Sequence, residues 1–397
     1  MNRREFAQML TAGAGSLGLA GPEGIALAEN EPPVRPSGAA SIANPVTVDD
    51  YRQNAQAQLP SATYDYIADG SGDGHTLRAN VDDLQRVNVL PPLLRGVAEP
   101  DLSTTVLGTK ISLPIMLAPV AGLRMFHPDG ALATARAAHV MGTLQGVSSS
   151  AFHSVEEVAA AASGPKWFQM YMPQDRRVAR RLVERVEAAG YEAIILTVDQ
   201  GEWKDNDRRN NFNVPRAMLI KHLRDIGFDV RDNWTDDELQ WFNAQAWDLA
   251  MTWDVFAWLR SATKLPLIIK GVLRPDDART AVELGLDGIV VSNHGGRRLD
   301  GMPSTIKMLP GVVGAVNGRC EVYMDSGIRR GTDVLKALAL GARAVLIGRA
   351  YAWGLAANGE QGVKGVLELL RDETANAMAS CGCAGVTDIN REFLTDL

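Results

Sequence analysis

Short apolar runs recur along the chain from about residue 113 onward, and polar stretches separate them. Each run is almost continuous in hydrophobic residues, which is typical of strands buried on both faces of a parallel sheet. The pattern predicts eight such strands, at 113–120, 143–149, 166–172, 193–199, 266–272, 288–295, 321–327 and 344–350.

Amphipathic stretches lie between these runs, and most of them end near a glycine that can cap a helix. Four clear examples are 129–142, 174–190, 274–285 and 331–341. Buried parallel strands that alternate with helices in eight units predict an α/β fold, a closed (β/α)₈ TIM barrel. An open doubly wound sheet is the alternative that the pattern leaves.

Two segments depart from the alternation. Residues 47–70 predict an N-terminal helical segment of two short helices, with Thr47 or Asp49 as a possible N-cap and Gly70 as a stop. After the fourth predicted strand comes a long insertion, 200–251, which contains an aromatic-rich helical pattern at 235–251. Loops of this length in a compact domain are usually lids or disordered, and the aromatic content favours a packed lid.

The N-terminus predicts a targeting segment. Arg3 and Arg4 precede a mild apolar stretch, and Ala26 and Ala28 supply the small residues of a cleavage site. This layout is that of a twin-arginine signal peptide, although a chance arginine pair is the alternative. We therefore expect a signal peptide over 1–28, a proline-rich linker over 29–44, the barrel domain over 45–397, and a periplasmic or otherwise exported protein. The apolar stretch is too short and glycine-rich for a stable membrane span.

Charge and cysteine content narrow the possible partners. The formal net charge is −7 and no long Lys/Arg block occurs, which argues against nucleic acid or an anionic membrane surface and favours a small-molecule ligand. Cys320, Cys381 and Cys383 are too few for a disulfide framework or a four-ligand zinc site. We expect no metal site.

Polar residues gather where the predicted strands end, which is where barrels of this kind build their active sites. Buried polar groups need partners, so packing alone explains so many poorly. A lone strand-end histidine is more often structural, but in the stretch VSNHGGRRLD two glycines and two arginines follow it. The strand-end residues are Ser148, Gln169, Tyr171, Thr197, Asp199, Lys270, Ser292, His294, Arg297, Asp325 and Arg349.

The last two predicted strands carry a second signal. MDSGIRRG places Gly327 near Arg329, and LIGRA places Gly348 beside Arg349. Backbone amides and guanidinium groups after the terminal strands are the usual phosphate site of such barrels. Two such pairs predict a phosphorylated cofactor or substrate.

These motifs together resemble one family. SNHGGRRLD, IIKGV, LTVD, FQMYM, YDYIADG and YMDSGIRRGTDVLKALALGARAVLIGR are similar to the FMN-dependent 2-hydroxy-acid oxidases and dehydrogenases, which include glycolate oxidase and lactate oxidase. The resemblance runs from about Val46 to Asp388. It implies FMN as cofactor, oxidation of a small L-2-hydroxy acid to the 2-oxo acid, electron transfer to oxygen or another acceptor, and a homotetramer.

The resemblance also implies roles for catalytic residues. His294 would be the base and Asp199 would stabilise its imidazolium form. Arg297 would grip the substrate carboxylate as a two-pronged donor, and Arg298 would point away as a solvated residue. Lys270 would lie near the N1 and O2 edge of the flavin, where negative charge accumulates on reduction.

The remaining matched residues divide between substrate and cofactor. Tyr66 and Tyr171 match two phenols that hold the substrate's carboxylate and hydroxyl. The isoalloxazine ring would be lined by Pro119, Val120, Ala121, Ser148, Gln169, Thr197 and Ser292. The ribityl phosphate end would be held by Asp325, Ser326, Gly327, Arg329, Gly348 and Arg349.

Departures from the family bear on the substrate. Lys204 falls where many relatives have a second carboxylate-binding arginine, and Arg208 or Arg209 could take that role instead. Ser150 replaces a tryptophan of glycolate oxidase-like relatives, which allows a larger substrate. Ala121 stands where alanine tends to accompany oxidases. The alternatives are a flavin barrel with other chemistry, such as a monooxygenase, and a non-catalytic flavin binder.

Overall fold

The computed structural model describes residues 41–199 and 212–395. The predicted signal peptide and most of the linker fall outside these residues, as do Lys204, Arg208 and Arg209. Within the described part, no helix is long and apolar enough to cross a membrane. That part also contains no group of three or more His, Cys, Asp or Glu side chains arranged to hold a metal ion.

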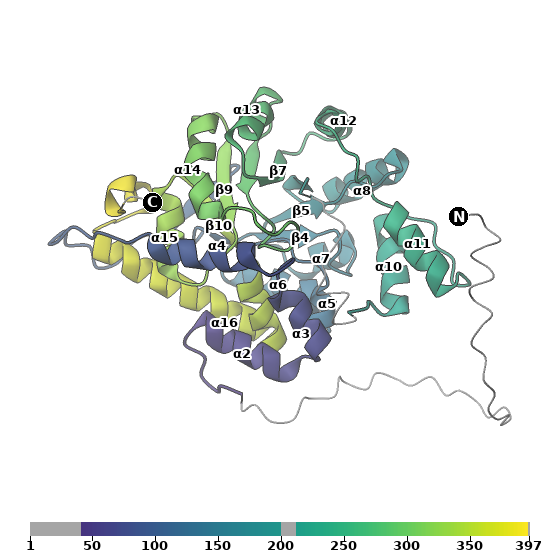
Figure 1. Ribbon diagram of the computed structural model, residues 1–397, viewed down its shortest axis with the longest axis horizontal. Coiled ribbons are helices and arrows are strands. Elements are labelled where there is room, and N and C mark those ends of the chain that lie inside the picture. Colours follow the sequence, from purple (N-terminus) through teal and green to yellow (C-terminus); the bar gives the residue numbers. More distant parts are fainter. Residues whose placement is uncertain (1–40, 200–211, 396–397) are drawn as a thin grey trace. The chain divides into compact units, whose positions relative to one another are not determined.

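Eight parallel strands close into a barrel, which confirms the predicted architecture and excludes the open sheet (Figure 1). The neighbour order follows the chain, with the last strand pairing with the first. All eight predicted strands are present, each somewhat shorter than its apolar run. They are β3 (Ile115–Leu117), β4 (Gln145–Ser148), β5 (Lys166–Met170), β6 (Ala193–Thr197), β7 (Leu267–Val272), β8 (Gly288–Val291), β9 (Glu321–Asp325) and β10 (Ala344–Ile347).

Helices surround the barrel, and those predicted from the amphipathic stretches are all present. The barrel helices are α6 (Gly130–Val140), α7 (Val155–Ala161), α8 (Arg176–Ala188), α12 (Asp254–Ala262), α13 (Pro275–Glu283), α14 (Thr305–Val316), α15 (Gly331–Ala339) and α16 (Arg349–Cys381). There are also three short helical segments: α5 (Leu123–Phe126) and the 3-10 helices η1 (Val386–Asp388) and η2 (Arg391–Phe393).

The N-terminal segment packs against the end of the chain. Helices α2 (Val48–Gln58) and α3 (Ser61–Ala68) lie beside α16, and α4 (His75–Arg86) follows them (Figure 1). Thr47 caps α2 through a capping box with Asp50, which decides between the two predicted caps. A small hairpin, β1 (Thr104–Val106) with β2 (Thr109–Ile111), precedes the barrel and was not expected.

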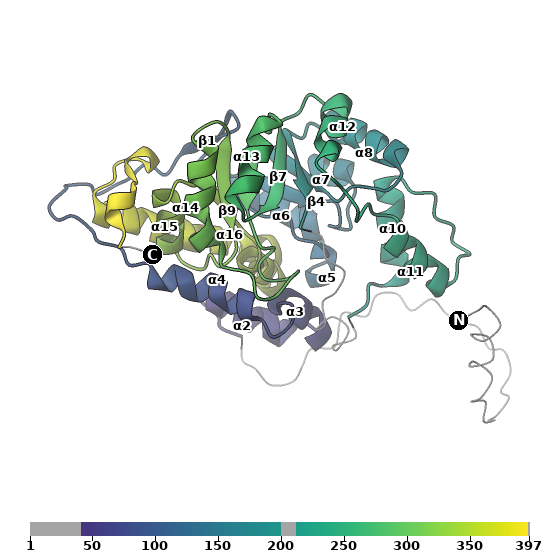
Figure 2. The ribbon, with the colours of Figure 1, turned by 45° about the horizontal axis from the view of Figure 1, so that its top comes forward.

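The insertion after β6 contributes packed helices in its described part. It contains α10 (Arg216–Ile226) and α11 (Asp236–Gln245), which lie side by side (Figure 2). Helix α11 falls within the predicted aromatic pattern, whereas α10 was not predicted. Phe228 contacts both Phe242 and Trp247, with ring centroids 5.5 and 5.8 Å apart, so the aromatic content holds the insertion together.

Candidate active site

A cavity of about 610 Å³ opens at the carboxyl ends of the barrel strands, a size suited to a cofactor with a small substrate. Most of the predicted site residues line it. Asp199 and Ser292 do not; they lie behind His294 and Lys270 and contact them. The predicted residues that line the cavity are Tyr66, Pro119, Val120, Ala121, Ser148, Gln169, Tyr171, Thr197, Lys270, His294, Arg297, Asp325, Ser326, Gly327, Arg329, Gly348 and Arg349.

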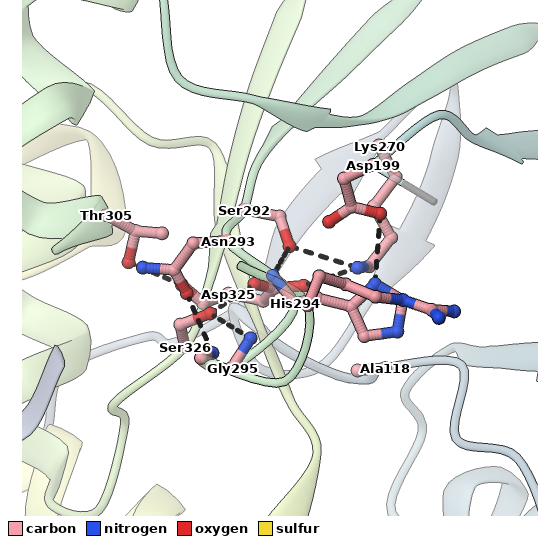
Figure 3. A network of polar contacts seen from close by, with 12 residues as sticks. Ala118, Asp199, Lys270, Ser292, Asn293, His294, Gly295, Thr305, Asp325 and Ser326 are labelled. Carbon is pink, nitrogen blue, oxygen red and sulfur yellow. Dashed lines mark hydrogen bonds and ion pairs between the residues drawn. The ribbon is translucent and has the colours of Figure 1, made fainter. Parts of the chain in front are cut away.

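His294 is held in an unusual backbone conformation directly after β8. Its φ angle is +57°, and Gly295 and Gly296 follow at +66° and +72°. A non-glycine residue in this left-handed region costs roughly 1 kcal/mol or more, so the surrounding contacts must hold it there. The amide of His294 donates to Ser292 Oγ at 3.0 Å, and the amide of Gly295 donates to Ser326 Oγ at 3.0 Å (Figure 3).

The His294 ring is paired with a carboxylate. Its Nδ1 lies 3.0 Å from Asp199 Oδ1 (Figure 3). Burial raises the pKa of Asp199, but its interactions with His294 and Lys270 outweigh this and hold it at about 2. Burial lowers the pKa of His294 to about 3, against the opposing effect of Asp199. A neutral imidazole that donates from Nδ1 to a charged Asp199 leaves Nε2 able to accept a proton.

Lys270 is a buried cation beneath the same loop. Its Nζ lies 3.3 Å from Asp325 Oδ2 and donates to Ser292 Oγ at 3.0 Å. Burial lowers the pKa of Lys270, but Asp325 and Asp199 more than offset this, so its pKa is raised and the ammonium stays charged. Two carboxylates therefore keep a positive charge at the floor of the cavity.

The loop that carries His294 is fastened to α4. Asn80 and Asn293 exchange two buried side-chain hydrogen bonds, 2.9 and 2.7 Å long. Asp300 accepts backbone hydrogen bonds from Thr76 and His75, at 2.7 and 3.1 Å, and so caps the N-terminus of that helix. These bonds fix both ends of the loop, which explains how the strained His294 backbone is maintained.

The two adjacent arginines of this loop lie on different sides of the cavity. Arg297 Nη1 donates to the carbonyls of Ile67 and Asp69, at 3.4 and 3.2 Å, and its guanidinium carbon is 4.9 Å from the Tyr66 ring centroid. Arg298 Nη2 donates to Tyr171 Oη at 2.8 Å. Both line the cavity. The expectation that Arg298 is a solvated residue pointing away is therefore wrong.

Arg329 and Arg349 face the cavity from the last two strand ends. Within the described chain, neither guanidinium forms an ion pair with a carboxylate. Arg349 donates instead to the carbonyls of Ile67, Asp69 and Gly295, each at 2.8 Å. Burial lowers the pKa of Arg329 to about 10, and burial together with neighbouring arginines lowers that of Arg349. Desolvated cations of this kind favour an anion such as phosphate.

Polar groups on the opposite wall fit a heteroaromatic ring. Ser148 Oγ donates to Gln169 Oε1 at 3.0 Å, and Gln169 Nε2 is buried without a partner within the described part of the chain. Such groups in native proteins need an explanation, and a bound ring with polar edges supplies one. The phosphate end and this wall thus fit the two ends of a flavin mononucleotide.

The cavity has an apolar region that the sequence did not identify. Phe152, Phe212, Leu219 and Trp247 line it, together with the buried His222. Phe212 stacks on Tyr66 with ring centroids 4.1 Å apart, and His222 stacks on Trp247 at 6.3 Å. Burial lowers the pKa of His222 to about 4, so its ring is neutral. The aromatic-rich insertion was the available signal, but it could not show which side chains face inward.

The fold and the cavity define a (β/α)₈ enzyme with a phosphate-binding end, a buried cation and a histidine–aspartate pair. A family model described as FMN-dependent dehydrogenase matches residues 55–396. The chain belongs to the FMN-dependent 2-hydroxy-acid oxidase and dehydrogenase family, and FMN is its cofactor. It is therefore an oxidoreductase that acts on the CH–OH group of 2-hydroxy acids.

Characterised relatives cover most of the chain. It is 47% identical to human 2-hydroxyacid oxidase 1, over 88% of this chain and 96% of that protein. It is 45% identical to spinach glycolate oxidase, over 87% and 95%. A crystal structure of a mandelate oxidase with (S)-2-phenylpropionate is similar with a TM-score of 0.79 and 41% identity, covering 89% of this chain and 98% of that chain.

Proposed function

We propose that this enzyme oxidises L-2-hydroxy acids with His294 as the base. The observation that carries the proposal is the contact of His294 Nδ1 with Asp199, made by a ring that faces the cavity beside Arg297. Arg297, Tyr66 and Tyr171 hold the carboxylate and hydroxyl of the substrate. Nε2 of His294 accepts a proton as the α-carbon is oxidised, and Asp199 stabilises the imidazolium that results.

FMN, when bound, accepts the two electrons that leave the substrate. Pro119, Val120, Ala121, Ser148, Gln169 and Thr197 would hold its ring system. Ser292 does not line the cavity and instead accepts hydrogen bonds from Lys270 and the His294 amide. Asp325, Ser326, Gly327, Arg329, Gly348 and Arg349 would hold the ribityl phosphate. Lys270 supplies a positive charge that offsets the negative charge gained on reduction.

The proposed substrate of this enzyme is a 2-hydroxy acid with a bulky apolar or aromatic side chain. Ser150 provides only a small side chain at the cavity wall, and Phe152, Phe212 and Trp247 offer apolar contact surface. Mandelate, which is named as the substrate of similar solved enzymes, fits this description better than glycolate. We therefore expect kcat/KM to rise from glycolate to L-lactate to (S)-mandelate.

The test is anaerobic mixing of the purified holoenzyme with each acid, followed by flavin absorbance. Bleaching by (S)-mandelate and not by its (R) enantiomer is the expected result. A flavin that none of the acids bleaches would refute the proposed reaction and favour a non-catalytic binder. Adding oxygen or a quinone to the bleached enzyme then identifies the acceptor by the rate of reoxidation.

Export is a separate proposal that rests on the sequence pattern at Arg3 and Arg4. A twin-arginine route carries folded proteins, so FMN would be inserted before transport. Periplasmic and cytoplasmic fractions should be compared for the full chain and for a variant with Arg3→Lys and Arg4→Lys. Retention of the variant in the cytoplasm is expected. Equal distribution of both proteins would contradict export by this route.

We also infer a homotetramer, as the family resemblance implies. Leu93 and Leu94 form an exposed apolar pair in the segment between α4 and β1, which suits an interface better than solvent. Sedimentation at micromolar concentration should give four times the mass of one chain. A monomer under these conditions would refute the inference.

A further inference from the structure

Arg298 occupies a position that a surface arginine would not. Its side chain lines the cavity, and Nη2 donates to Tyr171 Oη at 2.8 Å. The guanidinium carbon is 5.6 Å from the Tyr171 ring centroid, so the group also lies over the phenol ring. Burial lowers the pKa of Arg298, but the phenol of Tyr171 and the charge of Asp199 more than offset it, and the pKa is raised.

The backbone explains why two consecutive arginines both reach the cavity. Adjacent side chains on a strand point to opposite faces. Here His294, Gly295 and Gly296 all have positive φ angles, between +57° and +72°, so the chain curls before the arginines. Arg297 then extends toward Tyr66 on α3, whereas Arg298 extends toward Tyr171 directly after β5. Each phenol assigned to the substrate therefore has its own guanidinium.

We propose that Arg298 is a second carboxylate-binding residue of the active site and holds the substrate together with Arg297. The proposal rests on the hydroxy-acid function proposed above. A carboxylate has two oxygens with about four lone-pair sites and can accept from two guanidiniums at once. The family resemblance assigns a second arginine to the loop after the fourth barrel strand, where this chain has Lys204. Arg298 supplies a guanidinium from the loop after β8.

This assignment makes Arg298 a specificity-determining residue. A guanidinium presents a planar fork, whereas the lysine ammonium in the other loop presents a point charge. The fork approaches from the Tyr171 side and so fixes the orientation of the carboxylate relative to His294. It selects ligands with a carboxylate at this position over neutral ligands of the same shape.

The test compares a carboxylate with its amide in binding, without catalysis. The probe is (S)-2-hydroxy-2-phenylpropanoate, which has no α-hydrogen and cannot be oxidised, and the comparison ligand is its carboxamide. Calorimetry on the FMN-loaded protein gives Kd for the wild type, Arg298→Gln and Arg298→Lys. The matched control is Arg274→Gln, which removes an exposed arginine whose side chain is 72% accessible.

Arg298→Gln should weaken carboxylate binding by about tenfold to a hundredfold, the range for losing charge-assisted hydrogen bonds, and change amide binding by less than threefold. The carboxylate Kd of Arg298→Lys should lie between those of the wild type and Arg298→Gln. The Kd of Arg274→Gln should equal that of the wild type. Unchanged carboxylate binding in Arg298→Gln overturns the proposal, and so does an equal loss for acid and amide.

The outcome is separable from that of the proposed reaction. Flavin bleaching of the wild type tests the reaction, whereas the binding ratio tests Arg298. If the wild type bleaches normally but Arg298→Gln keeps the wild-type ratio of carboxylate to amide affinity, only the proposed role of Arg298 is refuted. The FMN content and Tm of each variant show whether it is folded. If Arg298→Gln is unstable, Arg298→Lys is compared with the wild type instead.

Discussion

The pairing of His294 with Asp199 leads to a quantitative prediction for Asp199→Asn. The substitution keeps the size of the side chain and removes its charge. Nδ1 and Oδ1 are 3.0 Å apart, and the two side chains are only 20% and 13% accessible. For charges whose centres are about 4 Å apart at an effective dielectric constant near 20, the attraction is about 4 kcal/mol. The asparagine oxygen recovers part of it by accepting from Nδ1.

This attraction arises only once His294 has taken the proton, so it acts on the reacting state and not on the free enzyme. A loss of about 3–4 kcal/mol should slow flavin reduction by ~10²–10³. Stopped-flow absorbance at saturating substrate without oxygen measures that rate directly. The Kd of (S)-2-hydroxy-2-phenylpropanoate should change little, because no proton is transferred to His294 when this acid binds.

Two results would refute this reasoning. Reduction within threefold of the wild-type rate would mean that Asp199 does not stabilise a charged imidazole. A loss of the same size in ligand binding would mean that Asp199 only supports the shape of the cavity. FMN content must equal that of the wild type, which separates both results from cofactor loss.

Three further predictions follow from the site and its supports. Arg329→Met should raise the Kd of FMN by ~10² because its guanidinium lacks a carboxylate partner among the described residues, and retention of tight FMN in a fluorescence dilution assay would contradict the phosphate assignment. Because burial lowers the pKa of His294 to about 3, the neutral base is lost only as pH falls through that value, and flavin reduction should stay level from pH 5 to 8; a midpoint near 6.5 would contradict this lowering of the pKa. Gly327→Ala should lower the free energy of unfolding by ~2–4 kcal/mol, since φ is +86° and a Cβ would collide with the Asn80 carbonyl oxygen. Gly314→Ala on α14 is the control for denaturant unfolding and should be neutral or stabilising by up to ~1 kcal/mol, because nothing lies within 4 Å of its added Cβ; equal effects of the two substitutions would contradict the packing argument.

The barrel could be predicted from the sequence because every strand is buried on both faces and so appears as an apolar run. The strand-end residues followed, since parallel strands bring their carboxyl ends to one edge. Helix α10 was not predicted although its buried Leu219 and Leu223 recur at helical spacing, because the insertion has no flanking strand boundaries that mark where a helix begins. Arg298 was misplaced because strand alternation does not hold after three residues with positive φ angles. Loop curvature of this kind depends on tertiary contacts, which sequence spacing does not encode.

The fastening of the His294 loop to α4 also determines when the site can form during synthesis. Asn80 and Asn293 are 213 residues apart in the chain, and Arg349 bonds to the Ile67 carbonyl across 282 residues. At translation rates of about 5–20 residues per second, α3 leaves the ribosome roughly 15–60 s before its last partner is made. Contacts this distant in sequence favour slow assembly, so the helices must wait with their apolar faces uncovered. Uncovered apolar faces favour aggregation during that interval. FMN can be captured only near the end of it, because Arg349 at the phosphate end is among the last residues of the site to be made.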